Sequence, residues 1–317
     1  MRLLQAFDEA YYERYLNQKE TRLHLWIPPT PSDTGVTMGA AYAFALAHGA
    51  KASDPLQHAF YCGLPIPSTN ISQILDADDT IAFLKLGNVQ DAPQRERSAD
   101  LLAYLIAHDG IIGLFQGMAE TGPRALGHRS ILANPCNPQT RTHLNAQVKF
   151  RELIRPLAPM LTREAALLLF EMDEGASDDD YNAYNYMVLT AQAKPESFPL
   201  IPAVIHKDGT SRLQIVREEI DPFTYSYLKA MGRRVGVEVS VNTSLNVGSP
   251  IVQTPEQALN ALKRAKGIDG LFLIGADDQC FLAWHNISVP PKDAGTRLRS
   301  WMQAWQEENQ HVSGESL

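Results

Sequence analysis

The chain alternates between apolar positions spaced as in helices and short apolar runs typical of buried strands. Helical spacing is clearest at 94–110, where Leu101, Leu102 and Leu105 face one side. Another helix is predicted after Thr254, which stands as an N-cap before a proline and a glutamate. The whole pattern predicts helices over 1–18, 32–49, 94–110, 138–148, 222–236 and 254–267. It predicts strands over 23–29, 111–117, 130–135, 237–244 and 268–275, and a hairpin over 201–216 that turns at Asp208-Gly209.

This mixture of helices, strands and a hairpin predicts an α/β protein, more specifically a mixed α+β arrangement around a twisted mixed sheet. Residues 50–90 are rich in turn formers, and "GNVQDAP" (87–93) separates them from the helix that begins at 94. We therefore expect two parts, 1–90 and 91–317, with a polar and frayed tail after about residue 290.

Composition narrows the class of protein. Hydrophobic residues make up 44% of the 317 residues, enough for a sizeable core. The formal net charge of -8 argues against broad nucleic-acid binding, which usually needs a basic face. The three cysteines are far apart, so neither a zinc ribbon nor a disulfide framework is indicated. No apolar run reaches the roughly 20 residues that a membrane span needs. We expect a cytoplasmic protein that binds no membrane.

Two arginines stand in a turn rich in glycine and small residues, "ETGPRALGHRSILANP" (120–135). No acidic residue follows Glu120 there that could pair with Arg124 or Arg129. A guanidinium presents several fixed N–H donors and suits planar or phosphoryl anions. We expect Arg124 to bind an anion and Arg129 to support the turn.

A second basic cluster is "KFRELIRPLAP" (149–159). If this piece is extended, Lys149 and Arg151 point to the same face, and Arg155 is biased to an extended backbone by the proline that follows it. Neighbouring apolar residues would place these cations at the edge of a core, where an anion is partly desolvated. The alternative is that they are exposed cations paired with Glu152 or Glu164.

Two polar turns add neutral donors and a carboxylate. "NTSLNVGSP" (242–250) follows a strand and carries Ser244 and Asn246, which suit either a phosphate or an ordinary capping turn. "SDTGVTMGA" (32–40) places Asp33 ahead of Gly35 and Gly39 at a helix start. That arrangement suits a metal-bound phosphate or a simple helix cap. The sequence contains neither G-x-x-x-x-G-K-[ST] nor a Rossmann G-x-G-x-x-G after a strand.

Four motifs occur in an order that is similar to a known family: "FQGMAETGPRALGHRSILANP", "VKFRELIRPLAPML", "HKDGTSRLQ" and "VNTSLNVGSPIVQTPEQAL". Together they resemble the C-terminal half of the O-carbamoyltransferases of nodulation-factor and antibiotic biosynthesis, from about residue 23 to 285. The resemblance implies that 91–317 is a YrdC-like domain that forms carbamoyl-adenylate from carbamoyl phosphate and ATP, with Mg²⁺. It also implies that 1–90 is the end of an actin/sugar-kinase-like transfer domain.

The resemblance also implies roles for individual residues. Arg124, Lys149 and Arg155 would act as catalytic groups that hold the carbamoyl and phosphate groups, and the substrate- and nucleotide-binding residues would be Arg151, Arg212, Ser244 and Asn246. In the first part, Asp33 would ligate a metal, Fe²⁺ or another divalent ion, and Gly35 and Gly39 would approach nucleotide phosphates.

The transfer half looks incomplete, because the paired histidines H-x-x-x-H of the family have no counterpart among the nine histidines. One carboxylate alone does not hold a catalytic metal. Two functions therefore stay open. The chain is a carbamoyltransferase that serves a hydroxyl-bearing acceptor, with its missing half supplied by a protein partner or lost. Alternatively, it is a non-catalytic nucleotide-binding subunit of a split enzyme. RNA binding is disfavoured by the acidic balance.

Overall fold

An eight-stranded mixed sheet lies at the centre of the protein. The computed structural model describes residues 2–25, 27, 33–51, 60–122, 124–173, 176, 182–265, 267–286 and 294–313. The strand order is β1-β11-β10-β2-β3-β9-β4-β8, in which β10–β2 and β4–β8 are parallel and the other neighbours antiparallel. The strands are β1 (Ile81–Asn88), β2 (Ile112–Phe115), β3 (Arg129–Ala133), β4 (Ala158–Thr162), β8 (Gln214–Val216), β9 (Val239–Ser244), β10 (Gly270–Ile274) and β11 (Gln279–His285). The mixed α/β class expected from the sequence is confirmed.

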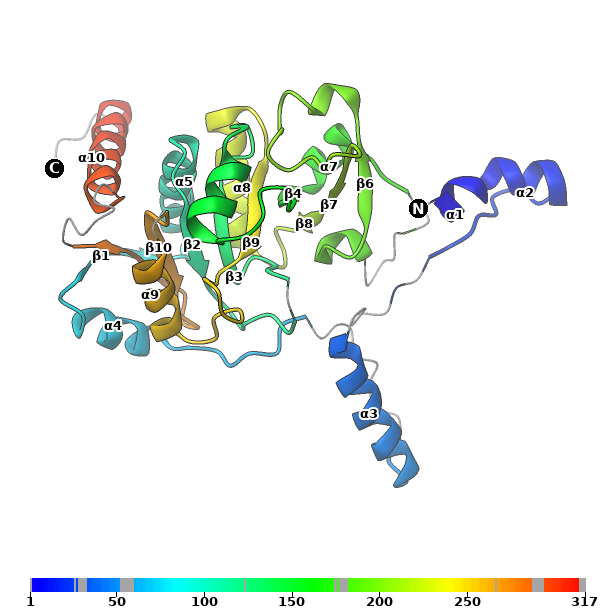
Figure 1. Cartoon of the computed structure of the whole chain (residues 1–317), viewed down its shortest axis with the longest axis horizontal. Helices are drawn as coiled ribbons and strands as arrows, with labels where there is room; N and C mark the ends of the chain where they lie inside the picture. The colour runs from blue at the N-terminus through cyan, green and yellow to red at the C-terminus, as the bar shows by residue number, and fades with distance from the viewer. Residues whose placement is uncertain are drawn as a thin grey trace.

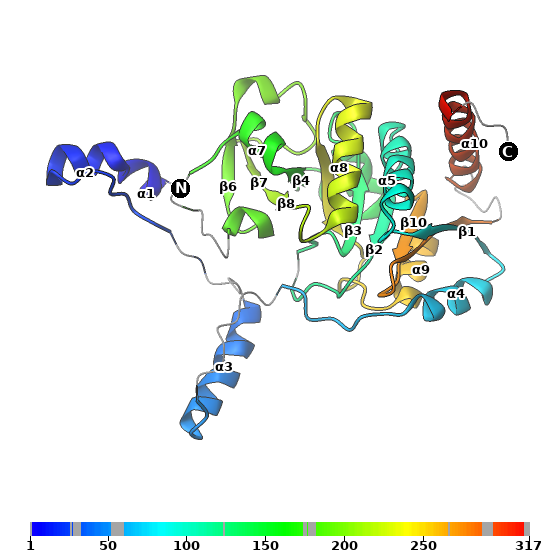
Figure 2. The ribbon, with the colours of Figure 1, turned by 180° about the vertical axis from the view of Figure 1, so that it is seen from behind.

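Helices cover both faces of this sheet (Figures 1 and 2). Residues of α5 (Ala92–Ala107), α8 (Pro222–Val235) and α10 (Ala294–Ser313) belong to one hydrophobic core. Residues of α4 (Ser68–Asp76), α9 (Pro255–Arg264) and the π-helical turn η1 (Leu144–Val148), which continues α6 (Thr140–His143), belong to the other. Strand side chains alternate between the two cores: Leu271 and Leu273 enter one and Phe272 the other.

Local signals placed most of these helices correctly. The predicted helices at 94–110, 222–236 and 254–267 correspond to α5, α8 and α9. Asp91 and Asp221 cap the first two, and Thr254 forms a capping box with Gln257 in the third. The predicted helix over 1–18 is divided into α1 (Arg2–Ala6) and α2 (Glu9–Leu16), because Asp8 starts a new helix by accepting a hydrogen bond from the Tyr11 N–H.

Three sequence predictions are wrong in detail. The tail after 290 is not simply frayed: α10 packs Leu298 and Trp305 into the core. The described residues of 23–29 form no strand. In the expected hairpin, residues 201–205 form a buried turn, because the Val204 N–H bonds to the carbonyl of Ile201 instead of to a partner strand.

A small second sheet takes up the remaining strand of that hairpin. Its order is β5-β6-β7, formed by β5 (Phe170–Glu171), β6 (Thr190–Ala193) and β7 (Thr210–Arg212), and it follows α7 (Arg163–Leu169). β7 is antiparallel to β6, with Arg212 opposite Thr190. The short link from β7 to β8 therefore joins the small sheet to the edge of the large one.

The division expected near residue 90 does not coincide with the packing. β1 precedes that boundary, yet it is antiparallel to β11, with Ile81 opposite His285. Phe60 and Ile71 also belong to the same core as α9. Pairing between strands that are far apart in sequence cannot be read from local turn formers, and the packed unit includes residues on both sides of the expected boundary.

One helix of the N-terminal part stands apart from this unit, although Leu4 of α1 is 7% exposed and belongs to the core. α3 (Asp33–Ala47) projects away from the sheet in both views of the ribbon. Its apolar side chains Val36, Phe44 and Leu46 are 70%, 67% and 58% exposed. Within the described segments, none of the helices combines the length and apolar composition that a bilayer crossing needs.

Candidate functional site

Four strand ends meet at one edge of the large sheet. β3 and β9 are antiparallel, with Ser130 opposite Ser244, and β9 is also antiparallel to β4, with Asn242 opposite Ala158. β4 and β8 are parallel. The beginnings of β3, β4 and β8 therefore share an edge with the end of β9. The predicted site residues of this unit belong to the segments at this edge: Arg124 before β3, Lys149, Arg151 and Arg155 before β4, Arg212 before β8, and Ser244 and Asn246 at the end of β9.

Lys149 is held at the centre of a polar network. Its ammonium group contacts the carbonyl and hydroxyl oxygens of Ser244, the carbonyl oxygen of Asn246 at 3.3 Å and Asn246 Oδ1 at 2.6 Å. Ser244 Oγ in turn donates to Asn246 Oδ1 at 2.9 Å. Burial, helped by the nearby charge of Arg151, lowers the pKa of Lys149 to about 7. The structure thus brings Lys149 against Ser244 and Asn246, two candidate residues from a distant turn.

The backbone around Lys149 is not extended, which corrects the sequence prediction. The Lys149 N–H bonds to the carbonyl of Leu144 at 2.8 Å and closes the π-helical turn, and the Arg151 N–H bonds to the carbonyl of Asn145 at 3.0 Å. Phe150 has a φ of 49°. Asn145 fixes the turn, since its Oδ1 accepts from Arg151 Nε at 2.7 Å and its Nδ2 donates to the carbonyl of Arg155 at 3.0 Å. Turn hydrogen bonds rather than strand alternation bring the lysine and arginine together.

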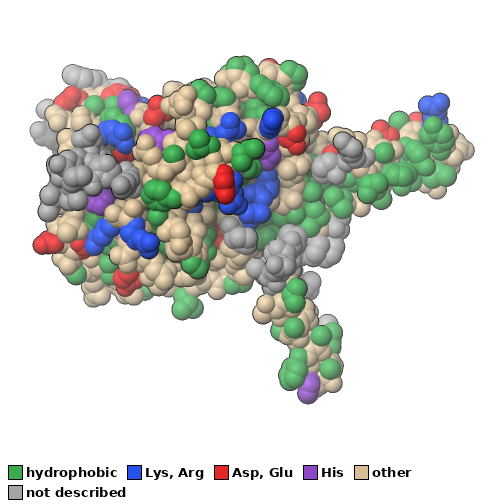
Figure 3. All heavy atoms as spheres, viewed as in Figure 1, with side chains coloured by type: hydrophobic (Ala, Val, Ile, Leu, Met, Phe, Trp, Pro, Cys, Tyr) green, Lys and Arg blue, Asp and Glu red, His purple; other side chains and the backbone are tan. Residues whose placement is uncertain are grey.

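More cations lie around Arg212. Its Nε is buried and has no hydrogen-bond partner among the described residues. Burial, helped by the charge of Arg124, lowers the pKa of Arg212 to about 10. Burial also lowers the pKa of His206, with smaller contributions in the same direction from Arg212 and Arg141. Lys and Arg side chains gather on this face of the molecule in Figure 3.

Arg124 and Arg129 have opposite environments, although they are only five positions apart. Arg124 is exposed. Arg129 is fully buried over the ring of Phe115 and donates to the carbonyl oxygens of Gln116 at 2.5 Å, His128 at 3.0 Å and Gly117 at 3.3 Å. Burial lowers its pKa to about 10. The structure thus agrees with the expectation that Arg129 supports the turn, while Arg124 is free to meet a ligand.

The predicted residues of 32–40 are not brought to this edge. α3 stands apart from the sheet in Figures 1 and 2. The side chain of Asp33 lies outside the described residues. A Cβ at Gly39 would meet nothing within 4 Å, so packing in this chain gives no reason for a glycine there. Among the described residues, no group of three His, Cys, Asp or Glu side chains could hold a metal ion.

Sequence reasoning missed several residues of the edge. Glu120, Arg141 and His206 were not selected, and Asn242 was noted only as a turn donor. Asn242 is 2% exposed and links two loops, since its Nδ2 donates to Ala125 O at 3.1 Å and to Gln214 Oε1 at 2.6 Å. The one local signal was Glu120, an acid at the beginning of the turn that contains Arg124 and Arg129.

The chemistry of this edge suits a polyanion. Cations are concentrated in a partly buried place, and hydroxyl and amide groups stand next to them. Buried cations have already lost part of their hydration. An anion that binds them therefore displaces less water from the cations, and the desolvation cost of binding is lower. Planar guanidinium groups add bidentate geometry for carboxylate or phosphate oxygens.

Comparison with known proteins agrees with this picture. Residues 103–276 match the family model described as the carbamoyltransferase C-terminus. The chain is 30% identical to the nodulation protein NolO of Bradyrhizobium diazoefficiens, over 87% of the chain and 49% of that protein. It is 32% identical to the nodulation protein NolNO of Sinorhizobium fredii, over 87% of the chain and 40% of that protein. It is also 34% identical to the nodulation protein U of Rhizobium tropici, over 70% of the chain and 34% of that protein.

A solved structure, that of HypF from T. kodakarensis, aligns with 65% of this chain and 23% of its own, at 17% identity and a TM-score of 0.35. That likeness is too low to bear on the site. The sequence relatives are different: the chain spans less than half of their length, and the matched part contains the whole cationic edge of the sheet. The chain belongs to the carbamoyltransferase family, and it matches the C-terminal region of that family.

Proposed function

We propose that the sheet edge binds carbamoyl phosphate and ATP and forms carbamoyl-adenylate, with phosphate and pyrophosphate as the other products. One water molecule balances the reaction, because both phosphate and pyrophosphate leave as free ions. A hydroxyl group of a small-molecule acceptor would later receive the carbamoyl group. The observation that carries the proposal is the convergence of cations from four separate segments on one partly buried edge, in a chain of this family.

The contacts support a division of roles. Lys149 is fixed by Ser244 and Asn246, so its ammonium group can hold phosphoryl oxygens without rearranging as charge moves between them. Arg212 has a buried Nε without a hydrogen-bond partner in the described part of the chain, which suits a ligand oxygen. Arg124 would bind from the exposed side of the turn, while Ser244 and Asn246 would contact the nucleotide.

Arg151 and Arg155 would complete the anion site from the turn that Asn145 organises. Arg151 is bonded through Nε to Asn145, which leaves its terminal nitrogens for a carboxylate-like or phosphoryl group. Burial lowers the pKa of Arg151, and the nearby charge of Arg155 lowers it further. Two neighbouring arginines are the arrangement that a polyphosphate stabilises. Mg²⁺ would arrive with the nucleotide, as it usually does at sites that bind through substrate phosphates.

The transfer step would need more than this edge. Asp33, Gly35 and Gly39 lie on α3, whose apolar side chains are exposed. We propose that α3 packs against a further protein segment that supplies the rest of a metal site for the transfer of the carbamoyl group. Fe²⁺ or another divalent ion would then be held by Asp33 together with ligands from that segment.

The test is pyrophosphate release by this chain with ATP and Mg²⁺, with and without carbamoyl phosphate. We expect release that depends on carbamoyl phosphate and falls at least about 100-fold in Lys149→Ala. Lys229→Ala is the matched control, because Lys229 is a half-exposed lysine that pairs with Glu238 away from this edge. Release that is independent of carbamoyl phosphate, or unchanged in Lys149→Ala, would contradict the proposal.

If the chain binds both ligands but releases no pyrophosphate, it acts as a nucleotide-binding subunit, and the exposed α3 favours that second reading. Adding the N-terminal region of a family member as a separate polypeptide then decides the matter. Restored release would show a split enzyme, and continued absence would show a non-catalytic subunit.

A further inference from the structure

The turn that carries Arg124 is held by an unusually complete set of side-chain hydrogen bonds. The carbonyl oxygens of Ala125, Leu126, Gly127 and His128 accept hydrogen bonds from the side chains of Asn242, Tyr61, Gln116 and Arg129, respectively. The N–H groups of Leu126, His128 and Arg129 donate to the carboxylate of Glu120, and the N–H of Gly127 donates to the hydroxyl of Ser130. Only Arg124 itself, at the beginning of this turn, is exposed. A backbone with many hydrogen bonds behind one exposed cation is how a protein preorganises a binding group.

Glu120 holds the turn from inside. One of its carboxylate oxygens, Oε1, accepts three backbone N–H groups, from Leu126 at 2.7 Å, His128 at 2.9 Å and Arg129 at 3.1 Å. Glu120 is 4% exposed, and its second oxygen has no hydrogen-bond partner among the described residues. Hydrogen bonds to an ionised acceptor are roughly twice as strong as neutral ones. A carboxylate here therefore fixes the turn more firmly than an amide would.

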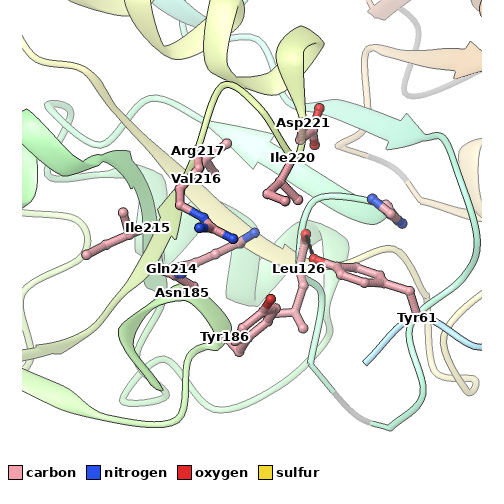
Figure 4. A pocket seen from close by; sticks show the side chains of 11 residues that line it. Tyr61, Leu126, Asn185, Tyr186, Gln214, Ile215, Val216, Arg217, Ile220 and Asp221 are labelled. Atoms are coloured by element: carbon pink, nitrogen blue, oxygen red, sulfur yellow. Dashed lines mark hydrogen bonds between the residues drawn. The ribbon is translucent and has the colours of Figure 1, made fainter. Parts of the chain in front are cut away.

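Tyr61 holds the same turn from the other side. Its hydroxyl donates to Leu126 O at 2.9 Å, a bond drawn in Figure 4. Its ring stacks on His128, with centroids 4.1 Å apart and planes inclined by 29°. Both rings border a small cavity of about 30 Å³, room for one or two water molecules. The tyrosine ring thus packs behind the turn, beside this water-sized space.

The segment that carries Tyr61 is itself fixed to the strand side of the turn. The N–H groups of Cys62 and Gly63 both donate to Ala119 O, at 3.1 and 3.0 Å, and Thr121 N donates to Phe60 O at 2.7 Å. A Cβ at Gly63 would lie 2.5 Å from Ala119 N, so only glycine permits this approach. Residues 60–63 and 119–121 therefore form one short antiparallel pair beside the arginine turn.

We propose that Tyr61 and Glu120 are positioning residues, which clamp the 125–129 turn from two sides and so fix the guanidinium of Arg124 where it binds the anionic substrate. Neither residue contacts the ligand. Their effect passes through Arg124 alone, and this inference rests on the proposed function of that arginine. A consequence is that residues 60–63, which lie outside the matched family region, set the affinity of the site.

The experiment measures the dissociation constant of carbamoyl phosphate by calorimetry on the whole chain. Tyr61→Phe removes one hydroxyl and keeps the ring on His128, and we expect about fivefold weaker binding, the effect of one lost hydrogen bond. Glu120→Gln keeps an acceptor but loses the charge, and we expect about tenfold weaker binding together with faster amide exchange at Leu126 and His128. Tyr227→Phe is the matched control, because Tyr227 is also buried and also loses one hydroxyl bond, to Ser240 at 2.8 Å.

A double-mutant cycle separates positioning from general destabilisation. In the Arg124→Ala background, Tyr61→Phe should leave the remaining affinity unchanged, because there is no guanidinium left to position. A fivefold loss in both backgrounds would overturn the inference, and so would a loss of the same size in Tyr227→Phe. Unchanged affinity in Tyr61→Phe, with a clear loss in Arg124→Ala, would overturn the inference and leave the proposed function intact. No binding by the unmodified chain, or no effect of Arg124→Ala, would overturn both.

Discussion

The sheet edge and helix α3 are two regions with predicted site residues, and they are built in contrasting ways. At the sheet edge, four distant segments converge, and Lys149 and Arg129 are each held by several hydrogen bonds. On α3, Asp33, Gly35 and Gly39 belong to a single helix whose apolar side chains are exposed. The described residues assemble the first region within this chain, whereas they leave the apolar side chains of the second region exposed. Two motifs that are equally clear in the sequence can thus differ in whether other described segments of the chain pack around them.

The strongest test of the rigid edge is Arg129→Met. This change leaves the carbonyls of Gln116, Gly117 and His128 buried without their donor. We expect the free energy of unfolding to fall by about 4 kcal/mol, because each unpaired buried acceptor is costly. Urea denaturation followed by circular dichroism measures it. Arg124→Ala is the control, with an expected change under about 0.5 kcal/mol; similar losses in both variants would refute the contrast between the two arginines.

A second test compares apolar side chains in the two regions. Leu75, on α4, is 2% exposed, whereas Phe44, on α3, is 67% exposed. Leu75→Ala should lower the free energy of unfolding by about 3 kcal/mol, from lost burial and the cavity left behind. Phe44→Ser should change it by less than about 0.5 kcal/mol. A large loss in Phe44→Ser, again from urea denaturation, would show that α3 packs within this chain.

The lowered pKa of Lys149, about 7, predicts pH-dependent binding at the edge. The protonated lysine attracts an anion and the neutral form does not, so affinity is full below pH 7 and is lost as the pH rises above it. We expect carbamoyl phosphate to bind up to about tenfold more weakly for each pH unit between pH 7.5 and 9, because Lys149 must take up one proton for the anion to bind. Calorimetry across this range measures the slope. Lys149→Ala should bind weakly with no such slope; a slope that persists would assign the titration to another group.

The smallest expected effect is on α3. Gly39→Ala adds a methyl group that meets nothing within 4 Å and replaces a poor helix former. We expect the substitution to stabilise the helix by less than about 1 kcal/mol, which would slow amide exchange within α3. The affinity of this chain for ATP should stay unchanged. Loss of ATP affinity would show that this glycine already approaches a nucleotide without any further segment.

The candidate site was more predictable than the layout around it. Arg124, Lys149, Ser244 and Asn246 could be selected because their motifs resemble a family and because cations beside apolar runs are chemically informative. The contribution of Tyr61 could not be predicted, since its bond to Leu126 joins residues that are 65 positions apart. Asn242 was noted only as a turn donor for the same reason: its partner Gln214 is on another strand.

Helices with strong start and stop signals, such as α5, α8 and α9, could be predicted from the amino-acid sequence alone. The same holds for the chemical character of the basic motifs. These depend on neighbours within a few residues, which the sequence displays directly. Three features depend on the packing of the whole chain and could not be predicted. These are the place of β1 in the large sheet, the turned rather than extended backbone after Lys149, and the position of the cations at one edge. Strand pairing and burial join residues far apart in the chain, so their outcome depends on all segments at once.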